Sequence, residues 1–343
     1  MNNLAIFSYE EETLEILKYV DYLKYNAVYI IDPFCRIKCN SEKCKFVCAE
    51  KEIVLDCDTL LIGNDQDVEV LEMRREIIKV FKEQNKRICL PKIIYDEMKL
   101  KENCSLIEHS EIIPNIKAKK LINIPAPVVT IMGDGANCDK FELLLKLKKT
   151  LEDDGYKVMG ISGKKYSSLF NILPIPKFLF EAMSLTDKIV AFNHYLYSVS
   201  FEENPDIILI SAPGGVMPIC EEAPEDFGEY CYVIANAAPP DILIRSMYFN
   251  KYNEKYIDED KKKLQYRMNV VPDIYYMSRT AIVYPVFLFD KIEYVKIPDE
   301  KAKEIEELLY ENNVQIYSNL DKNSIKTIKN HIVDSLSDGF SII

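Results

Sequence analysis

Histidine is scarce in this chain of 343 residues, and its scarcity narrows the kinds of active site that the sequence can encode. The three histidines are His109, His194 and His331. A cysteine–histidine nucleophile would pair one of them with Cys138 or Cys220, but no sequence pattern supports such a pair. The G-x-S-x-G segment of serine hydrolases is also absent. The sequence therefore does not predict nucleophilic catalysis of either kind.

Positive charge and long apolar runs are lacking as well. The chain has 43 lysines and arginines against 55 aspartates and glutamates, which gives a formal net charge of −12. Because phosphate backbones and anionic lipids attract basic surfaces, this balance argues against nucleic acid or a membrane as a partner. No apolar run reaches the ~18 residues of a membrane span, and the start, MNNLAIFSYEEE, lacks the basic region of a signal peptide. We therefore expect a cytoplasmic protein.

Ten cysteines are present, and in a reducing cytoplasm we expect free thiols rather than disulfides. Four of them lie within fourteen residues: Cys35, Cys39, Cys44 and Cys48. Thiolates at this density suit zinc or an iron–sulfur cluster. Their spacing, C-x3-C-x4-C-x3-C, matches neither a zinc ribbon nor a ferredoxin. Ordinary thiols in a β-hairpin are therefore the alternative to a metal site.

Short apolar strands alternate with amphipathic helices in the first third of the chain. Strands are expected at residues 3–8, 27–32, 58–64 and 86–91. Between the first two, Ile16, Leu17, Val20 and Leu23 form one helical stripe. Because such alternation favours parallel pairing, residues 1–118 are expected to form a Rossmann-like domain that carries the cysteine cluster. The turn after its first strand, SYEEET, lacks the dinucleotide-binding glycine fingerprint.

A second strand–helix series begins after a proline-containing connector at residues 116–127. Strands are expected at VVTIM, YKVMGIS, 205–215, 229–241 and 279–287, and helices at 139–155 and 176–200. We expect residues 119–297 to form a P-loop-like domain and residues 298–343 a helical tail. The predicted fold class is therefore α/β. It consists of two open, mostly parallel three-layer sheets, Rossmann-like and then P-loop-like, with a helical C-terminal tail.

The segment MGDGANCDKFELLLKLKK, residues 132–149, has the layout of a phosphate-binding loop: strand, glycine turn, lysine, helix. Glycines let backbone N–H groups approach phosphate oxygens, and a helix N-terminus attracts anions. A second glycine turn ends the apolar strand 205–215. Because ligands bind beyond the carboxyl ends of parallel strands, both turns are expected at one nucleotide or anion site. The candidate binding residues are Gly133, Asp134, Gly135, Asn137, Asp139, Lys140, Gly214 and Gly215.

This loop resembles the GxGxxxGKT loop of the dethiobiotin-synthetase and nitrogenase-iron-protein class of P-loop proteins. In that register Gly133, Gly135 and Lys140 match, whereas Asp139 replaces the last glycine and Phe141 the hydroxyl that holds magnesium. An aspartate about 4 Å from a phosphate would oppose binding by roughly 4 kcal/mol at an effective dielectric constant of 20. We therefore expect a loop that holds an anion but is a poor Mg·ATPase. Asp134 or Asp139 is the alternative magnesium ligand, because magnesium prefers oxygen.

The chain as a whole is similar to a family of accessory proteins of bacterial peptide maturation systems. The stretches that carry this resemblance are VVTIMGDGANCDKFELLLKLKK, ISGKKYSSLF, PDIILISAPGGVMP, EDFGEYCYVIANAAPPD and LAIFSYEEE. Members of the family are encoded, mostly in clostridia, beside a radical SAM enzyme and a small precursor peptide. The resemblance implies cytosolic work on or near a ribosomally made peptide, with the precursor peptide, the radical SAM enzyme or both as partners.

Three functions follow from these features. The first is an accessory or scaffold protein with a degenerate nucleotide-binding fold, which helps a modifying enzyme act on its peptide. The second is an ATP-dependent enzyme, a kinase or ligase, that uses the loop from Gly133 to Lys140 with ATP and magnesium. The third is a cysteine-rich metal-handling protein that binds zinc or an iron–sulfur cluster. The sequence does not decide whether the protein is an enzyme.

Overall fold

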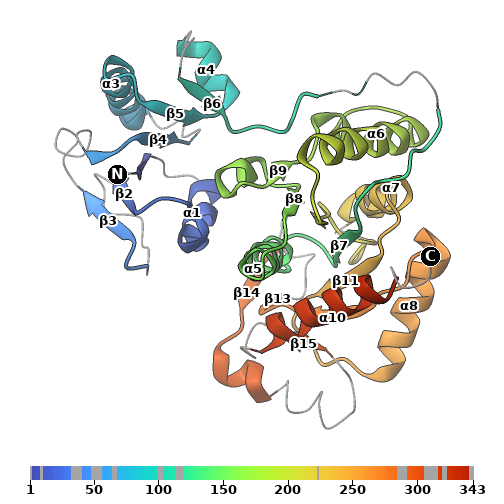
Figure 1. The fold of residues 1–343 in the computed structure, drawn as a ribbon. Helices are drawn as coiled ribbons and strands as arrows, with labels where there is room; N and C mark the ends of the chain where they lie inside the picture. The colour runs from blue at the N-terminus through green and yellow to red at the C-terminus, as the bar shows by residue number, and fades with distance from the viewer. Residues whose placement is uncertain are drawn as a thin grey trace. The chain divides into compact units, whose positions relative to one another are not determined.

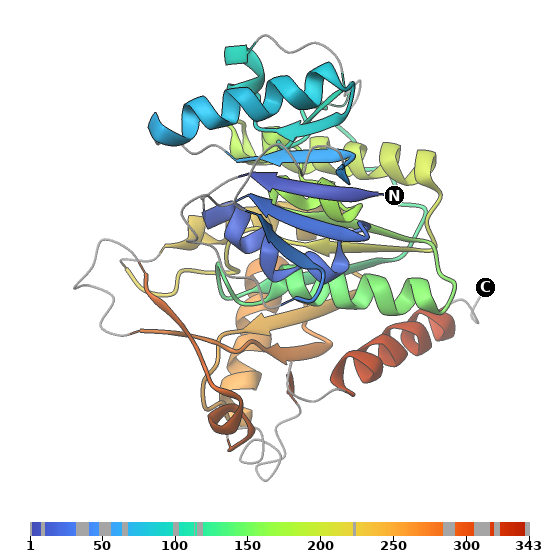
Figure 2. The same ribbon diagram turned by 90° about the vertical axis from the view of Figure 1, so that its left-hand side faces the viewer.

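The computed structural model describes residues 2–7, 11–31, 41–47, 56–63, 68–98, 103–112, 114, 119–221, 224–283, 292–304, 316–318 and 323–339 (Figure 1, Figure 2). The chain divides into two compact units. Unit 1 is Met1–Glu108 together with Lys165–Asn171, and unit 2 is His109–Lys164 together with Ile172–Ile343. Among the described residues, no helix has both the length and the apolar character that crossing a bilayer requires.

Unit 1 contains a six-stranded sheet in which each strand is parallel to its neighbours. The strand order, β3-β2-β1-β4-β5-β6, is that of Rossmann-type doubly wound sheets. The strands are β1 (Asn3–Phe7), β2 (Ala27–Ile31), β3 (Cys44–Val47), β4 (Thr59–Ile62), β5 (Arg87–Leu90) and β6 (Cys104–Leu106). The helices are α1 (Glu11–Lys18), η1 (Val20–Tyr22), α3 (Val68–Glu83), α4 (Lys92–Met98) and η2 (Lys165–Phe170).

Apolar side chains on both faces of the sheet form the core of unit 1. β1 and β4 are buried along their whole length, as expected for parallel strands that helices cover on both faces. From α3, Ile78 packs into this core. The helical stripe predicted from the sequence is confirmed, because Ile16, Leu17, Val20 and Leu23 are all buried.

Unit 2 contains a seven-stranded sheet in the order β15-β12-β11-β7-β10-β8-β9, again with every neighbouring pair parallel. Its strands are β7 (Val128–Gly133), β8 (Val158–Ser162), β9 (Leu173–Pro174), β10 (Ile207–Ser211), β11 (Ile242–Met247), β12 (Ile274–Met277) and β15 (Tyr317–Ser318). Its helices are α5 (Lys140–Asp153), η3 (Lys177–Phe180), α6 (Leu185–Glu203), η4 (Glu225–Gly228), α7 (Glu229–Ala237), α8 (Glu254–Met268) and α10 (Ser324–Gly339).

Helices cover both faces of the unit 2 sheet (Figure 1). Successive strand residues face opposite sides, and Ile208 and Ile210 of β10 pack in one core cluster with residues of α6 and α7. On the other face lies α5, with α10 beside it (Figure 2). Lys329 of α10 forms an ion pair with Asp154, the residue that follows α5, at 2.5 Å. The α/β class with two mostly parallel sheets and a C-terminal helix, predicted from the sequence, is confirmed.

One predicted strand, residues 229–241, is wrong: Glu229–Ala237 forms helix α7. Its buried residues include Cys231, Ile234 and Ala235, which follow the spacing of one helical face. A short apolar run fits a buried strand and a buried helix equally well, and here the turn at Gly228 starts a helix.

The predicted helix at residues 176–200 is also not continuous. Lys177–Phe180 forms the separate turn η3, and α6 begins only at Leu185. The cause is a helix cap: Ser184 Oγ accepts a hydrogen bond from the Asp187 N–H at 3.2 Å and donates one to the Asp187 carboxylate at 2.6 Å. A capping serine ends the preceding segment and starts a new helix.

The strand predicted at residues 279–287 does not join the main sheet. Its described part forms β13 (Thr280–Ile282), which pairs antiparallel with β14 (Tyr294–Lys296). The main sheet instead includes β11, which the sequence analysis missed because Arg245 interrupts its apolar run. The predicted helical tail, residues 298–343, contributes strand β15 as well as helix α10.

Candidate functional site

The glycine loop predicted from the sequence follows β7, at the point where the direction of strand succession in the unit 2 sheet reverses. β7 lies between β10 and β11 in the sheet. The next strands along the chain, β8 and β10, lie on one side of β7, and the strands that follow them, β11 and β12, lie on the other side. In open parallel sheets, ligands bind beyond the carboxyl ends of strands at such a reversal. The loop at residues 134–139 then runs directly into α5, which begins at Lys140.

Lys140 connects the two glycine turns that the sequence analysis assigned to one site. Its ammonium group donates a hydrogen bond to the Gly135 carbonyl at 2.8 Å and another, shorter one to the Gly214 carbonyl. Gly135 and Gly214 lie 79 residues apart in the sequence, so only the fold brings them together. In phosphate-binding loops the lysine lies at this position, between the loop backbone and the end of the neighbouring strand.

Lack of space for a Cβ explains the glycines of both turns. A Cβ at Gly133 would lie 2.3 Å from the Cys138 sulfur, and one at Gly215 would lie 2.3 Å from the Asp134 carbonyl oxygen. The Val216 N–H donates to the Gly133 carbonyl at 2.9 Å, which joins the second turn to the end of β7. The two turns are therefore packed against each other and not merely adjacent.

Asp139, the residue expected to oppose a phosphate, has a specific partner elsewhere. Its carboxylate accepts a hydrogen bond from the Arg279 N–H at 3.1 Å, beyond the end of β12. Burial raises the pKa of Asp139 above its usual value, and nearby Glu142 raises it further. Asp139 and Asn137 both have positive φ angles, 56° and 57°, in the left-handed region that aspartate and asparagine tolerate.

The loop does not fit the magnesium ion of Mg·ATP in the usual way. Phe141, which replaces the magnesium-binding hydroxyl, is buried. Asp134, one alternative ligand, has both carboxylate oxygens engaged: Oδ1 by the Arg245 guanidinium and Oδ2 by the Tyr248 N–H at 2.8 Å. The loop therefore has a lysine and backbone N–H groups that can bind an anion. It lacks a free oxygen ligand for magnesium at the position of the usual hydroxyl.

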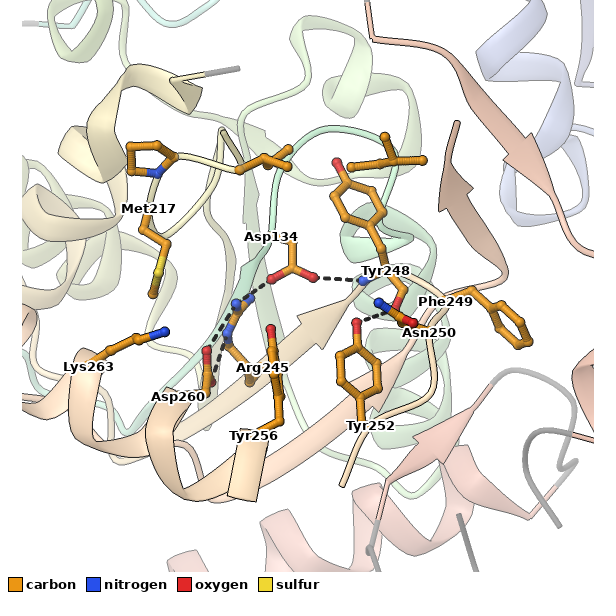
Figure 3. A pocket seen from close by; sticks show the side chains of 13 residues that line it. Asp134, Met217, Arg245, Tyr248, Phe249, Asn250, Tyr252, Tyr256, Asp260 and Lys263 are labelled. Carbon is orange, nitrogen blue, oxygen red and sulfur yellow. Dashed lines mark hydrogen bonds and ion pairs between the residues drawn. The ribbon is translucent and has the colours of Figure 1, made fainter. Parts of the chain in front are cut away.

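A buried ion triad lies beside the loop (Figure 3). Arg245 of β11 is 1% exposed and pairs with Asp134 of the loop and with Asp260 of α8, its Nε lying 3.2 Å from Asp260 Oδ2. Burial alone would lower the pKa of Arg245, but the two carboxylates raise it overall. The Tyr275 hydroxyl also donates to Asp260 at 3.2 Å. Because removal of one member of a buried ion pair typically costs about 3–5 kcal/mol, this triad ties α8 and the loop to the sheet.

A cavity of about 420 Å³ opens next to this triad. Its wall combines charged, aromatic and apolar side chains from the loop, the turn after β10, the end of β11, α8 and β13 (Figure 3). The lining residues are Asp134, Met217, Pro218, Ile219, Arg245, Tyr248, Phe249, Asn250, Tyr252, Tyr256, Asp260, Lys263 and Ile282. A volume of this size matches that of small-molecule sites, which occupy roughly 300–1,000 Å³.

The cysteine cluster gives only partial information. Cys44 opens β3 and is disulfide-bonded, which corrects the expectation of a free thiol at this residue. Cys35, Cys39 and Cys48 lie outside the described residues. Within the described ranges, no group of three or more His, Cys, Asp or Glu residues is arranged to hold a metal ion. A metal site at the four cysteines thus stays a prediction, and a disulfide sulfur cannot act as its thiolate ligand.

Two histidines and the loop cysteine have structural partners. His109 Nδ1 lies 3.0 Å from the Ile175 carbonyl, and His194 Nε2 lies 2.8 Å from the Lys120 carbonyl. Cys138 is buried, and its thiol donates to the Gly135 carbonyl at 3.0 Å. These contacts favour structural roles for His109, His194 and Cys138.

The sequence analysis missed several residues that the fold adds to the site: Arg245, Tyr248 and Asp260 at the cavity, and Glu225 at the loop. A charged residue inside the apolar run ILIRSM was the available signal for Arg245, because a buried arginine requires acidic partners. No local pattern marks Asp260, which lies in the polar helix α8. The role of Asp260 depends on its hydrogen bond with Arg245, which lies 15 residues away on β11.

The strand–loop–helix unit at β7 and the parallel strand order around it define unit 2 as a phosphate-loop-like α/β fold. No protein-family model and no curated protein sequence matches the chain. Among solved structures, a DUF1611 family protein from Anabaena variabilis is similar with a TM-score of 0.62 and 11% identity, covering 97% of this chain and 100% of that chain. At this identity, the similarity establishes a shared fold alone.

Two further solved structures match the chain with low TM-scores. A LAO/AO transport system kinase is 14% identical with a TM-score of 0.33, covering 62% of this chain and 59% of that chain. The hydrogenase maturation factor HypB from Archaeoglobus fulgidus is 12% identical with a TM-score of 0.31, covering 61% of this chain and 89% of that chain.

Proposed function

We propose that unit 2 binds a small molecule carrying phosphate groups, such as a nucleotide, at the loop from Gly133 to Lys140. The contact of Lys140 with both the Gly135 and the Gly214 carbonyls carries this proposal. It places a positive charge between two glycine turns at the carboxyl end of the parallel sheet, where backbone N–H groups and the N-terminus of α5 also favour an anion.

The same loop favours binding over magnesium-dependent turnover. Buried Phe141 supplies no hydroxyl, and Asp134 is committed to Arg245 and to the Tyr248 N–H. This arrangement agrees with an accessory protein that has a degenerate nucleotide-binding fold. It disfavours a kinase or ligase that uses Mg·ATP.

The cavity beside the triad offers room for the rest of such a ligand. Asp134 belongs both to the loop and to the cavity wall, so a phosphate at the loop and an organic group in the cavity would be neighbours. Tyr252 and Tyr256 supply aromatic surface, their ring centroids 4.8 Å apart, and Lys263 supplies a positive charge. A flat or partly apolar group with hydrogen-bond donors fits this lining.

Calorimetric titration with ADP and ATP, each with and without magnesium, tests the proposal. We expect binding that does not require magnesium and that Lys140→Ala weakens roughly 10- to 100-fold, since a charged hydrogen bond contributes about 1.5–3 kcal/mol. Lys149→Ala is the matched control, because Lys149 lies on the same helix, exposed and paired with Asp153 at 2.9 Å. Thermal unfolding of each variant verifies that it is folded.

Two outcomes would contradict this function. If wild-type protein binds neither nucleotide, nor inorganic pyrophosphate, the loop is only an element of the fold. If the protein hydrolyses or transfers the terminal phosphate of Mg·ATP, and Lys140→Ala abolishes that activity, the ATP-dependent enzyme is the correct function and the binding protein is wrong.

We further propose, from the sequence resemblance, that the partner is a ribosomally made precursor peptide, its radical SAM enzyme or both. The resemblance is the support for this proposal. Co-expression with the peptide and the enzyme encoded beside the gene, followed by affinity purification, tests it. Stable co-purification with either component is the expected result, and its absence with both components would reject these partners.

A further inference from the structure

One carboxylate of the chain lies on the backbone of the glycine loop. The carboxylate of Glu225, the first residue of η4, lies near the Ala136 N–H, which favours its ionised form. A Cβ placed at Gly135 would lie 2.8 Å from both Cδ and Oε1 of Glu225, so the carboxylate lies directly against the loop. An oxyanion bound by this loop would occupy the same space.

The charges around Glu225 match those that a phosphate would meet. The positive charge of Lys140 lowers the pKa of Glu225, whereas the negative charges of Asp226 and Asp134 raise it. Burial is the largest influence, and the pKa of Glu225 is raised overall. Lys140 and the Ala136 N–H therefore favour the ionised carboxylate, whereas burial disfavours it.

The segment that carries Glu225 has an uncommon backbone conformation. Glu225, Asp226 and Phe227 have φ angles of 46°, 51° and 52°, and Gly228 follows with 75°. Successive non-glycine residues in the left-handed region are strained, because their Cβ atoms crowd the following carbonyl. The Arg267 guanidinium donates to the Phe227 carbonyl, which holds the segment from α8. Residues 225–228 therefore carry backbone strain next to the glycine loop.

We propose that Glu225 occupies the phosphate position of the loop as an internal competitor, so that a ligand binds only by displacing this carboxylate. The inference rests on the proposed function of the loop. It also specifies the ligand class: a diphosphate or triphosphate group, whose charge and oxygens can engage Lys140 and the Ala136 N–H together, displaces a single carboxylate. A monophosphate or a monocarboxylate competes poorly.

The test compares Glu225→Ala with wild-type protein in titrations with pyrophosphate, ADP and AMP. We expect Glu225→Ala to bind pyrophosphate and ADP at least about tenfold more tightly, and to discriminate less between ADP and AMP. Asp226→Asn is the matched control: it removes one negative charge from the same segment without emptying the loop, and a smaller gain is expected. Lys140→Ala in the Glu225→Ala background should cancel the gain.

The outcomes separate the competitor from the binding site itself. Equal affinities of wild-type protein and Glu225→Ala, with binding present in both, would overturn the competitor and leave the proposed function standing. Absence of binding in every variant would reject both. A gain in Asp226→Asn as large as that in Glu225→Ala would mean that general charge, and not occupancy of the loop, limits binding, which also overturns the competitor.

A second measurement uses wild-type protein only and covers the case in which Glu225→Ala fails to fold. Hydrogen exchange of the amides of residues 225–228 is followed with and without saturating pyrophosphate. We expect faster exchange in this segment with the ligand, because Glu225 has left the loop, and slower exchange in residues 134–140. Unchanged exchange in residues 225–228 beside protection of the loop would overturn the displacement.

Discussion

At the scale of single residues, the site depends on charges whose partners come from other elements. Arg245 is held between Asp134 and Asp260, and Asp139 takes the Arg279 N–H as its donor. In the sequence, Asp139 suggested repulsion of phosphate and Asp134 an alternative magnesium ligand. The fold instead uses both as acceptors for neighbouring groups, so they fix the loop in place.

Asp139 gives a pH-dependent prediction. Burial raises its pKa above the usual 3.8, with Glu142 adding to the shift and the Arg279 N–H, Lys296 and Lys146 opposing it. The folded state therefore binds this proton more tightly than the unfolded chain, and the stability that protonation provides is present below the unfolded pKa and is lost as the pH rises through the folded pKa. At neutral pH the ionised carboxylate is a net cost.

Asp139→Asn should therefore raise the thermal midpoint at pH 7, and this advantage should shrink as the pH falls towards about 4. Asparagine keeps an acceptor for Arg279 and tolerates the φ angle of 56°. Thermal unfolding from pH 4 to pH 8 measures the difference. Asp153→Asn, which changes an exposed residue of α5, is the control and should stay within about 0.5 kcal/mol throughout. A lower midpoint for Asp139→Asn at pH 7 would contradict the argument.

At the scale of elements, sequence patterns predicted those features whose causes are local. Hydrophobic periodicity and turn residues were enough to predict the strand, glycine turn and helix at β7 and α5. The leucines predicted to face inward, Leu144, Leu147 and Leu151, are all buried. The prediction from sequence patterns failed where contacts with other segments of the chain bury the residues. Helix α7 was taken for a strand, and β11 was missed, because its arginine is neutralised by residues far away in the sequence.

The packing of the two glycine turns makes Gly215 a test at this scale. In Gly215→Ala the new Cβ would lie 2.3 Å from the Asp134 carbonyl oxygen, a backbone atom that cannot move away alone. We expect a loss of about 1–3 kcal/mol in stability, as for other overpacked sites, together with weakened ligand binding at the loop. Denaturant unfolding and the ADP titration measure the two effects.

Gly155→Ala is the matched control for this change. A Cβ at Gly155 meets no atom within 4 Å, and only its φ angle of 94° is unfavourable. It should lower stability through backbone strain, typically about 1–2 kcal/mol, without altering affinity for the ligand. If Gly215→Ala binds ADP as tightly as wild-type protein, contact between the two turns is not needed for the site.

At the scale of the whole molecule, the chain divides into two compact units. Ile78 belongs to the cluster of unit 1, whereas Leu147 is buried in α5 of unit 2. Two compact units favour two unfolding transitions instead of one cooperative step. Calorimetry of the full chain tests this expectation directly.

Variants in each core assign the transitions. Ile78→Ala and Leu147→Ala should each cost about 2–5 kcal/mol in the unit that carries the change. Each should lower one transition by several degrees, since 1 kcal/mol shifts the midpoint by roughly 2–8 °C in domains of 60–250 residues. The other transition should stay in place. A single transition lowered by both variants would show that the units unfold together.

The sequence by itself determined the parallel α/β class, the glycine turns and the helix that begins at Lys140, because periodicity, turn residues and helix starts act over a few neighbouring positions. Only the tertiary structure decided what the loop contacts. Arg245 meets Asp134 across 111 positions of the chain, and the Glu225 carboxylate lies against Gly135 from a different segment. Such contacts arise from the order of strands in the sheet, which brings distant strand ends to one edge, and no local pattern encodes which charges meet there.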